Sequence, residues 1–245
     1  MRFLPFAVVL ALSHGLISSL VCAQTPYRFD IVAREGDTVG GLPISDLGTA
    51  RINDNGLIAF SGSSGSTSAV WSTSGVLLAE GQSLGGGVNL PDFDTFNFAL
   101  NNAGQVGVSG AVNSQGVFTS SGIAITAGST IGGQTITGNF GSNVALADDG
   151  TSFFIADVGT TTTVFNANSI LAQEGQTIGG VALNDIGNEL LNGAFAIDDA
   201  GNAIFYNNAD FFNSPGPPAV VSTAGFALEQ GSSFPTGPLA GQTID

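Results

Sequence analysis

Two short motifs recur along this chain at nearly constant spacing, and together they constrain its fold more than any other feature. The first occurs as REGDTVGG (34–41), AEGQSLGG (79–86), TAGSTIGG (126–133), QEGQTIGG (173–180) and, in degenerate form, EQGSSFPTG (229–237). The leading glycines of successive copies are 45, 47, 47 and 56 residues apart. Repeats of this length are typical of solenoids, propellers and similar arrays.

The second motif is an Asx-rich turn that ends in glycine and keeps step with the first. It occurs as INDNGLIAF (52–60), LNNAGQVGV (100–108), LADDGTSFF (146–154) and IDDAGNAIF (197–205), with glycines 48, 46 and 51 residues apart. Asx at the first turn position and glycine at the fourth favour a type I turn with a bulge, which joins two antiparallel strands. Because two independent markers advance together, chance is a poor explanation of the repeat.

Each period contains four short segments with alternating apolar residues, and helical spacing is missing throughout. Four strands in a repeat of about 40–50 residues is the pattern of a β-propeller blade. We therefore predict an all-β, β-propeller-like fold, with a β-solenoid as the rival. The expected blades are four-stranded and antiparallel, and they span about 48–83, 94–130, 140–177 and 188–232.

The two ends of the repeat region predict an incomplete ring. The segment 27–37 matches only the fourth strand of a blade, so it predicts an N-terminal outer strand whose three partner strands are missing. Ring propellers commonly close by sharing one blade between both termini. We expect the natural protein to continue past Asp245, because the last residues stop where another blade would begin.

Residues 1–23 have the pattern of a signal peptide. Arg2 is followed by an apolar run, and Val21 and Ala23 fit the small-residue rule for cleavage after Ala23. A lipoprotein acylated at Cys22 is the alternative. We predict a secreted or cell-surface protein whose residues 24–245 form one repeat domain without a transmembrane segment.

The charge of residues 24–245 excludes several partners. Three arginines stand against 19 acidic residues, which gives a net charge of −16. A nucleic-acid partner is excluded, because phosphate contacts need clustered lysines and arginines. The hydrophobic content of the whole chain, 43%, predicts a packed core and not a disordered acidic chain. The expected partner is an extracellular protein or glycan.

The same residues contain no His, Cys or Lys. Nucleophile systems that pair Ser or Cys with His, or Ser with Lys, are therefore impossible, as is zinc held by His or Cys. We predict no catalytic residue, metal ligand or cofactor. The alternatives are a glycan-active enzyme that uses paired carboxylates and a calcium-stabilised adhesin.

Three features resemble sites, and the sequence favours a structural role for each. The Asx turns lack the later bidentate Glu of a calcium loop. The acidic row Glu35, Glu80 and Glu174 is interrupted by Ala127 and Gln230, which fits exposed strand ends. The glycine runs are followed by a strand and not by a phosphate-binding helix, so they predict loops between blades.

Two aromatic features remain. Trp71 occupies the place of Phe118 and Phe165 in other repeats, which predicts a core residue and not a sugar-stacking platform. The one non-repetitive insertion, ADFFNSPGPPA (209–219), is the candidate partner-binding loop. Its candidate contact residues are Phe211, Phe212, Pro215, Pro217 and Pro218.

The leader, the [IL]-x-[DN]-x-G turns before apolar strands and the G-x-[ST]-x-G-G motifs together resemble a bacterial group. These are exported, propeller-like repeat proteins, some of which carry a C-terminal PEP-type sorting signal. The resemblance covers nearly all of residues 27–245 and implies export, without catalytic residues to carry over. We expect an exported, non-enzymatic scaffold that acts in binding or surface interaction.

Overall fold

The computed structural model describes residues 31–110, 116–186, 195–207 and 218–231. Every regular element in these ranges is a β-strand. The chain divides into two units, Met1–Val32 and Ala33–Asp245, and all the described strands belong to the second. The predicted leader, residues 1–23, lies outside the described residues.

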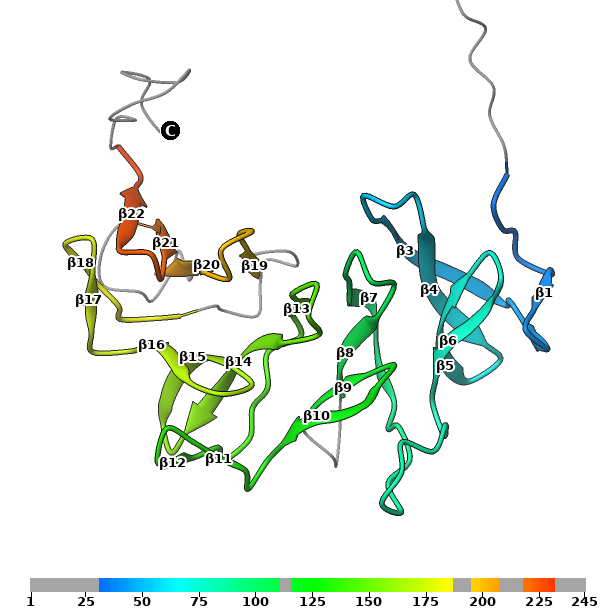
Figure 1. Cartoon of the computed structure of the whole chain (residues 1–245), viewed down its shortest axis with the longest axis horizontal. Helices are drawn as coiled ribbons and strands as arrows, with labels where there is room; N and C mark the ends of the chain where they lie inside the picture. Colours follow the sequence, from blue (N-terminus) through cyan, green and yellow to red (C-terminus); the bar gives the residue numbers. More distant parts are fainter. Residues whose placement is uncertain (1–30, 111–115, 187–194, 208–217, 232–245) are drawn as a thin grey trace, which may run out of the picture. The chain divides into compact units, whose positions relative to one another are not determined.

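Each of the four predicted repeats forms one four-stranded antiparallel sheet, whose strands pair in chain order (Figure 1). Sheet one contains β3 (Asp46–Ile52), β4 (Ile58–Ser64), β5 (Thr67–Ser72) and β6 (Gly75–Ala79). Sheet two contains β7 (Phe93–Leu100), β8 (Val106–Gly110), β9 (Gly116–Thr119) and β10 (Gly122–Thr126). Sheet three contains β13 (Val144–Leu146), β14 (Ser152–Val158), β15 (Thr161–Asn166) and β16 (Ile170–Gln173). Sheet four contains β19 (Phe195–Ile197), β20 (Ala203–Asn207), β21 (Ala219–Ser222) and β22 (Phe226–Glu229). This order confirms the predicted all-β, propeller-like repeat.

A two-stranded hairpin precedes sheets one, three and four and contains the G-G step of the first motif. The hairpins are β1 (Thr38–Val39) with β2 (Leu42–Pro43), β11 (Thr130–Ile131) with β12 (Gln134–Thr135), and β17 (Thr177–Ile178) with β18 (Val181–Ala182). Gly40 and Gly41 have φ of 60° and 85°, the positive values that a type I′ turn requires. A Cβ on Gly40 would lie 2.7 Å from the backbone nitrogen of Val76, so the hairpin tip packs against β6. The expected loops between blades therefore contain ordered hairpins.

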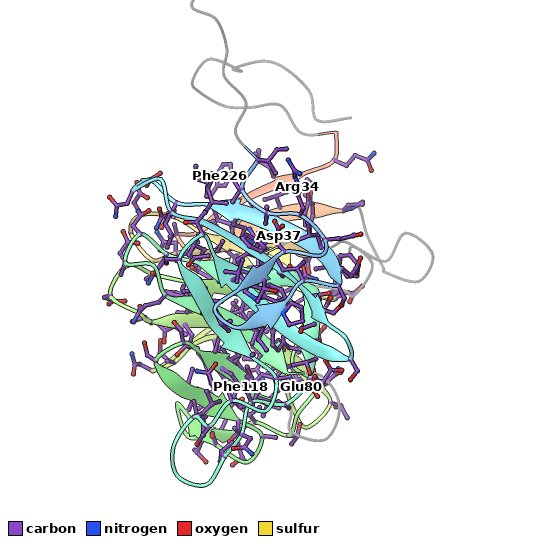
Figure 2. The ribbon with its side chains drawn as sticks, turned by 90° about the vertical axis from the view of Figure 1, so that its right-hand side faces the viewer. Arg34, Asp37, Glu80, Phe118 and Phe226 are labelled. Carbon is purple, nitrogen blue, oxygen red and sulfur yellow. The ribbon has the colours of Figure 1, made fainter. Side chains whose placement is uncertain are left out.

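The N-terminal segment differs from the prediction of an outer strand over residues 27–37. Residues 31–37 belong to none of the described strands, and residues 27–30 lie outside the described part. Arg34 and Asp37 instead close a turn, in which the Arg34 amide donates to Asp37 Oδ2 at 2.9 Å (Figure 2). A strand needs a neighbour for its backbone hydrogen bonds, and no described strand pairs with this segment.

The core consists mainly of three clusters between consecutive sheets. We call the face of a sheet that packs on the next sheet in the chain its trailing face, and the opposite face its leading face. Between sheets one and two the cluster combines trailing-face Ala59, Val70 and Leu78 with leading-face Phe98, Val108 and Phe118. Between sheets two and three, Val117 packs with Phe154 and Phe165. Between sheets three and four, Phe153 and Val164 pack with Phe205 and Val221. Alternate apolar residues of one strand thus face two different neighbouring sheets.

The first strands of consecutive sheets lie next to one another. β3 contacts β7, β7 contacts β13, and β13 contacts β19. We call these four strands the inner strands. Residues on the inner strands contact neighbouring repeats. A side chain on an inner strand that differs from the repeat pattern is therefore a candidate site residue.

Candidate functional site

The recurring Asx turns are hairpin turns, as predicted. The Asn53 amide donates to the carbonyl of Leu57 at 3.1 Å, and the Gly56 amide donates to the carbonyl of Asn53 at 2.9 Å. Asn53 Oδ1 also accepts from the Leu57 amide at 2.8 Å. Gly56 has φ of 78°, which other residues adopt only with strain. The same side-chain bond recurs at Asn101 and Asp198.

The third copy keeps this turn although its first Asx is replaced. Ala147 has no side-chain acceptor, and Asp149 Oδ1 accepts from the Thr151 amide at 2.8 Å instead. That backbone hydrogen bond lowers the pKa of Asp149. At Asp198 the hydrogen bonds from the side chain and backbone of Asn202 lower the pKa of the carboxyl in the same way. The turn therefore tolerates exchange of its polar residues as long as one oxygen caps the strand.

Neighbouring turns are also joined to each other, which the sequence did not predict. Asn102 Oδ1 accepts from the Asp54 amide at 2.9 Å. Asn102 Nδ2 lies 3.0 Å from Asp54 Oδ2 and 3.1 Å from Asp148 Oδ2. The backbone amide of Asn102 donates to Asp148 Oδ1 at 2.8 Å. One asparagine thus connects the turns of sheets one, two and three.

A second row of bonds runs parallel to this one. Asn53 Nδ2 donates to the carbonyl of Asn101 at 2.9 Å, and Asn101 Nδ2 donates to the carbonyl of Ala147 at 2.8 Å. We call both rows together the turn ladder. Asn53 and Asn101 occupy the same position in consecutive turns. Each closes its own hairpin and also binds the turn of the next sheet.

Two of the three glutamates of the acidic row, Glu80 and Glu174, accept hydrogen bonds from backbone amides. Glu80 Oε2 accepts from the Ser68 amide at 3.2 Å (Figure 2). Glu174 accepts from the amides of Thr162 at 3.1 Å and Ile186 at 3.2 Å. Each glutamate thus fastens the end of its sheet. Within the described ranges, no three His, Cys, Asp or Glu side chains gather to hold a metal ion.

Trp71 is a core residue, as predicted. Its side chain is 0% exposed and stacks on Phe60, with ring centroids 5.9 Å apart. Of the candidate partner-binding loop, Phe211, Phe212, Pro215 and Pro217 lie outside the described residues. Pro218 is half-buried, and its carbonyl accepts from the Gln230 amide at 2.9 Å, which places it in the backbone of sheet four.

Two depressions share residues of the inner strands. The first has a volume of about 370 Å³ and is lined by Arg51 and residues 97–100, 143–146 and 195–197. The second, of about 340 Å³, is lined by Gly201 and residues 100–102, 146–148 and 197–199. Both include Leu100, Leu146 and Ile197. The inner strands and the turn ladder therefore line one shared concave surface, which we call the inner depression.

Arg51 is the cation of the inner depression. Its Cζ lies over the Phe98 ring, 5.5 Å from the centroid, as in a cation–π contact. In the described part of the chain the guanidinium has no carboxylate partner and no hydrogen bond. Desolvation lowers the pKa of Arg51, and the group nevertheless stays charged at any physiological pH.

The repeat register contained a signal for Arg51. Five residues before the turn glycine, the other three copies have Ala99, Ala145 and Ala196. Alanine suits close packing of neighbouring inner strands, so Arg51 departs from the residue that the architecture uses. Comparing the copies position by position for such departures would have identified it.

Across the ranges described, no helical segment has the length and apolar character needed to cross a bilayer. No protein-family model and no curated protein matches the chain. One solved structure with a similar backbone is a protein of unknown function from Bacteroides caccae, 17% identical to this chain. The match covers 75% of this chain and 66% of that one, just under two thirds of its length, with a TM-score of 0.39. A likeness at that level carries no conclusion about this chain.

Proposed function

We propose that this chain is an exported, non-enzymatic binding scaffold that recognises an extracellular glycan or protein through the inner depression. The sheets form the framework, and the inner strands and turns present the contact groups. The one observation that carries the proposal is Arg51, a charged side chain with neither a carboxylate partner nor a hydrogen bond in the described part of the chain, at a position where the repeat uses alanine.

Several sequence features support export and binding. Residues 1–23 have the pattern of a cleaved leader, and the repeat motifs resemble those of exported propeller-like proteins. The absence of His, Cys and Lys from residues 24–245 removes the common nucleophile systems. The backbone contacts of Glu80 and Glu174 favour a structural role over acid–base chemistry.

The shape of the inner depression supports ligand binding. Its two parts have volumes of about 370 and 340 Å³, at the lower end of the range for small-molecule sites, which is about 300–1,000 Å³. Its lining combines apolar residues such as Leu100 and Ile197 with the amides of Asn101 and Asn102. More of the lining surface is polar than apolar, which suits a hydrophilic ligand such as a glycan.

The test is a binding screen of the full chain on arrays of extracellular glycans and matrix proteins, beside the Ala196→Tyr variant. Ala196 is exposed and lines the depression, so tyrosine should fill it without disturbing the core. We expect the variant to keep the wild-type melting temperature and to lose at least about tenfold in affinity, the loss of a well-placed contact set. Unchanged binding by the variant would refute this site, and turnover of a bound glycan would refute the non-enzymatic assignment.

A further inference from the structure

We infer that the ligand of the inner depression is an acidic saccharide, with one carboxylate held by Arg51 and hydroxyls held by the neighbouring turns. This inference rests on the proposed function, since it assigns a chemical class to the same site. Arg51 supplies the charge, and the turn residues that line the depression supply the hydroxyl acceptors. The acid group and the hydroxyls therefore have separate partners.

The N–H groups of Arg51 favour a carboxylate. Its Cζ lies over the Phe98 ring, and within the described ranges none of the guanidinium N–H groups donates a hydrogen bond, so they can donate to a ligand. A planar carboxylate accepts two parallel N–H bonds from such a fork. Arg51 has no carboxylate partner within the described ranges. A ligand carboxylate could therefore bind without first displacing a carboxylate of the protein. The ring beneath the guanidinium limits its rotation and therefore the entropy lost on binding.

The charge around the depression limits the number of acid groups. From residue 52 to the end of the chain there is no Lys, Arg or His, so Arg51 is the sole cation of the four sheets. The part of the depression shared with the turns contains the carboxylates of Asp148, Asp198 and Asp199. Acidic peptides or nucleic acids would place several negative charges beside these groups, which is unfavourable. A ligand whose carboxylates are far apart, so that only one of them lies in the depression, avoids that repulsion.

The same turn residues suit sugar hydroxyls. Carboxylate and amide oxygens accept hydrogen bonds from hydroxyl groups, and each carboxylate has about four acceptor positions. Within the described chain, the carboxylate of Asp199 makes no hydrogen bond, so all its positions are open to a ligand. Leu100 and Ile197 supply the apolar surface on which the C–H face of a sugar can rest.

The experiment measures binding of the full chain to oligosaccharides that contain hexuronic or sialic acid. Each one is paired with its carboxyl methyl ester, which keeps the sugar and removes the charge. Arg51→Ala restores the residue of the other repeats and should fold normally, as a melting curve will check. Arg51→Lys keeps the charge without the planar fork, and Arg34→Ala removes a cation outside the four sheets.

We expect at least one acidic saccharide to bind, with a loss of roughly tenfold to a hundredfold for both its ester and Arg51→Ala. Arg34→Ala should bind like the wild type, and Arg51→Lys should fall between. Equal binding of acid and ester, full binding by Arg51→Ala, or preference for a glutamate-rich peptide would overturn the inference. Binding of neutral glycans alone would overturn it while leaving the proposed function intact. Failure to bind any acidic saccharide would overturn it as well.

Discussion

Replacing Asn102 by Asp should weaken the contacts between neighbouring turns and so lower the free energy of unfolding. Asn102→Asp keeps the shape and the acceptor oxygen for the Asp54 amide. It removes the donor that now lies 3.0 Å from one carboxylate, of Asp54, and 3.1 Å from another, of Asp148. It also puts a third negative charge between them. The substitution therefore turns two attractive contacts between repeats into two repulsive ones.

The magnitude follows from these contacts. Each lost hydrogen bond contributes about 0.5–1.5 kcal/mol net, and the exposed position favours the low end. Two unit charges about 4 Å apart repel by about 1 kcal/mol in water. Asn102→Asp should thus lower the free energy of unfolding by about 3 kcal/mol, or about 6–12 °C in melting temperature for a domain of this size. Asn102→Ala, which adds no charge, should cost about 1–2 kcal/mol.

The assay is reversible chemical and thermal unfolding, followed by far-ultraviolet circular dichroism. The exposed charges are screened by salt, so the difference between Asn102→Asp and Asn102→Ala should shrink at 1 M NaCl, where the Debye length is about 3 Å. Asn55→Ala is the matched control, because it removes one bond between the same two turns, from Asn55 Nδ2 to the carbonyl of Asn102 at 2.7 Å, and adds no charge. The reasoning is refuted if Asn102→Asp is as stable as the wild type at low salt.

Three further predictions concern packing, turn geometry and pH. Val164→Ala, in the fully buried trailing face of sheet three, should lower the free energy of unfolding by about 2–3 kcal/mol. Val220→Ala, at the equivalent half-buried position of sheet four, should lower it by less than half of that amount. Equal losses of stability would contradict the packing of the two sheets. Gly40→Ala should cost more than about 1 kcal/mol, because φ is 60° and the new Cβ would meet a backbone nitrogen at 2.7 Å; a melting curve like that of the wild type would disprove this. Asp198 has a lowered pKa in the folded chain, so its contribution to stability is present above its unfolded pKa and is lost as the pH falls through the folded value. Asp198→Asn, which can cap the turn as Asn53 does, should reduce the loss of melting temperature between about pH 5 and 2, and an unchanged acid limb would count against the hydrogen bonds to Asn202.

The repeat made the architecture predictable from the sequence. The turn glycines and the alternating apolar residues identified strands, because local geometry and burial both depend on residue type at fixed spacing. Gly56 and Phe60 illustrate this, since one closes the turn and the other is buried in sheet one. Ala59, beside Phe60, is buried in a different hydrophobic cluster. The alternation of apolar residues does not reveal which cluster each of the two residues joins.

The contacts between repeats could not be predicted in the same way. Asn102 reads as an ordinary turn residue, and its bonds to Asp54 and Asp148 arise only when the sheets stand side by side. The outer strand expected over residues 27–37 depended on partners that a strand pattern cannot supply. In the sequence Arg51 is one of three cations of residues 24–245, and only the packing of the inner strands places it over Phe98 at the depression.

The most direct test of the account is a double-mutant cycle between neighbouring turns. Asn102→Ala, Asp148→Ala and the double variant are compared with the wild type by reversible unfolding. The turn ladder predicts a coupling of about 0.5–1.5 kcal/mol, because both single changes remove the hydrogen bond from Asn102 Nδ2 to Asp148 Oδ2 between sheets two and three. Additive effects, with a coupling of zero within error, would contradict the claim that these turns join one repeat to the next.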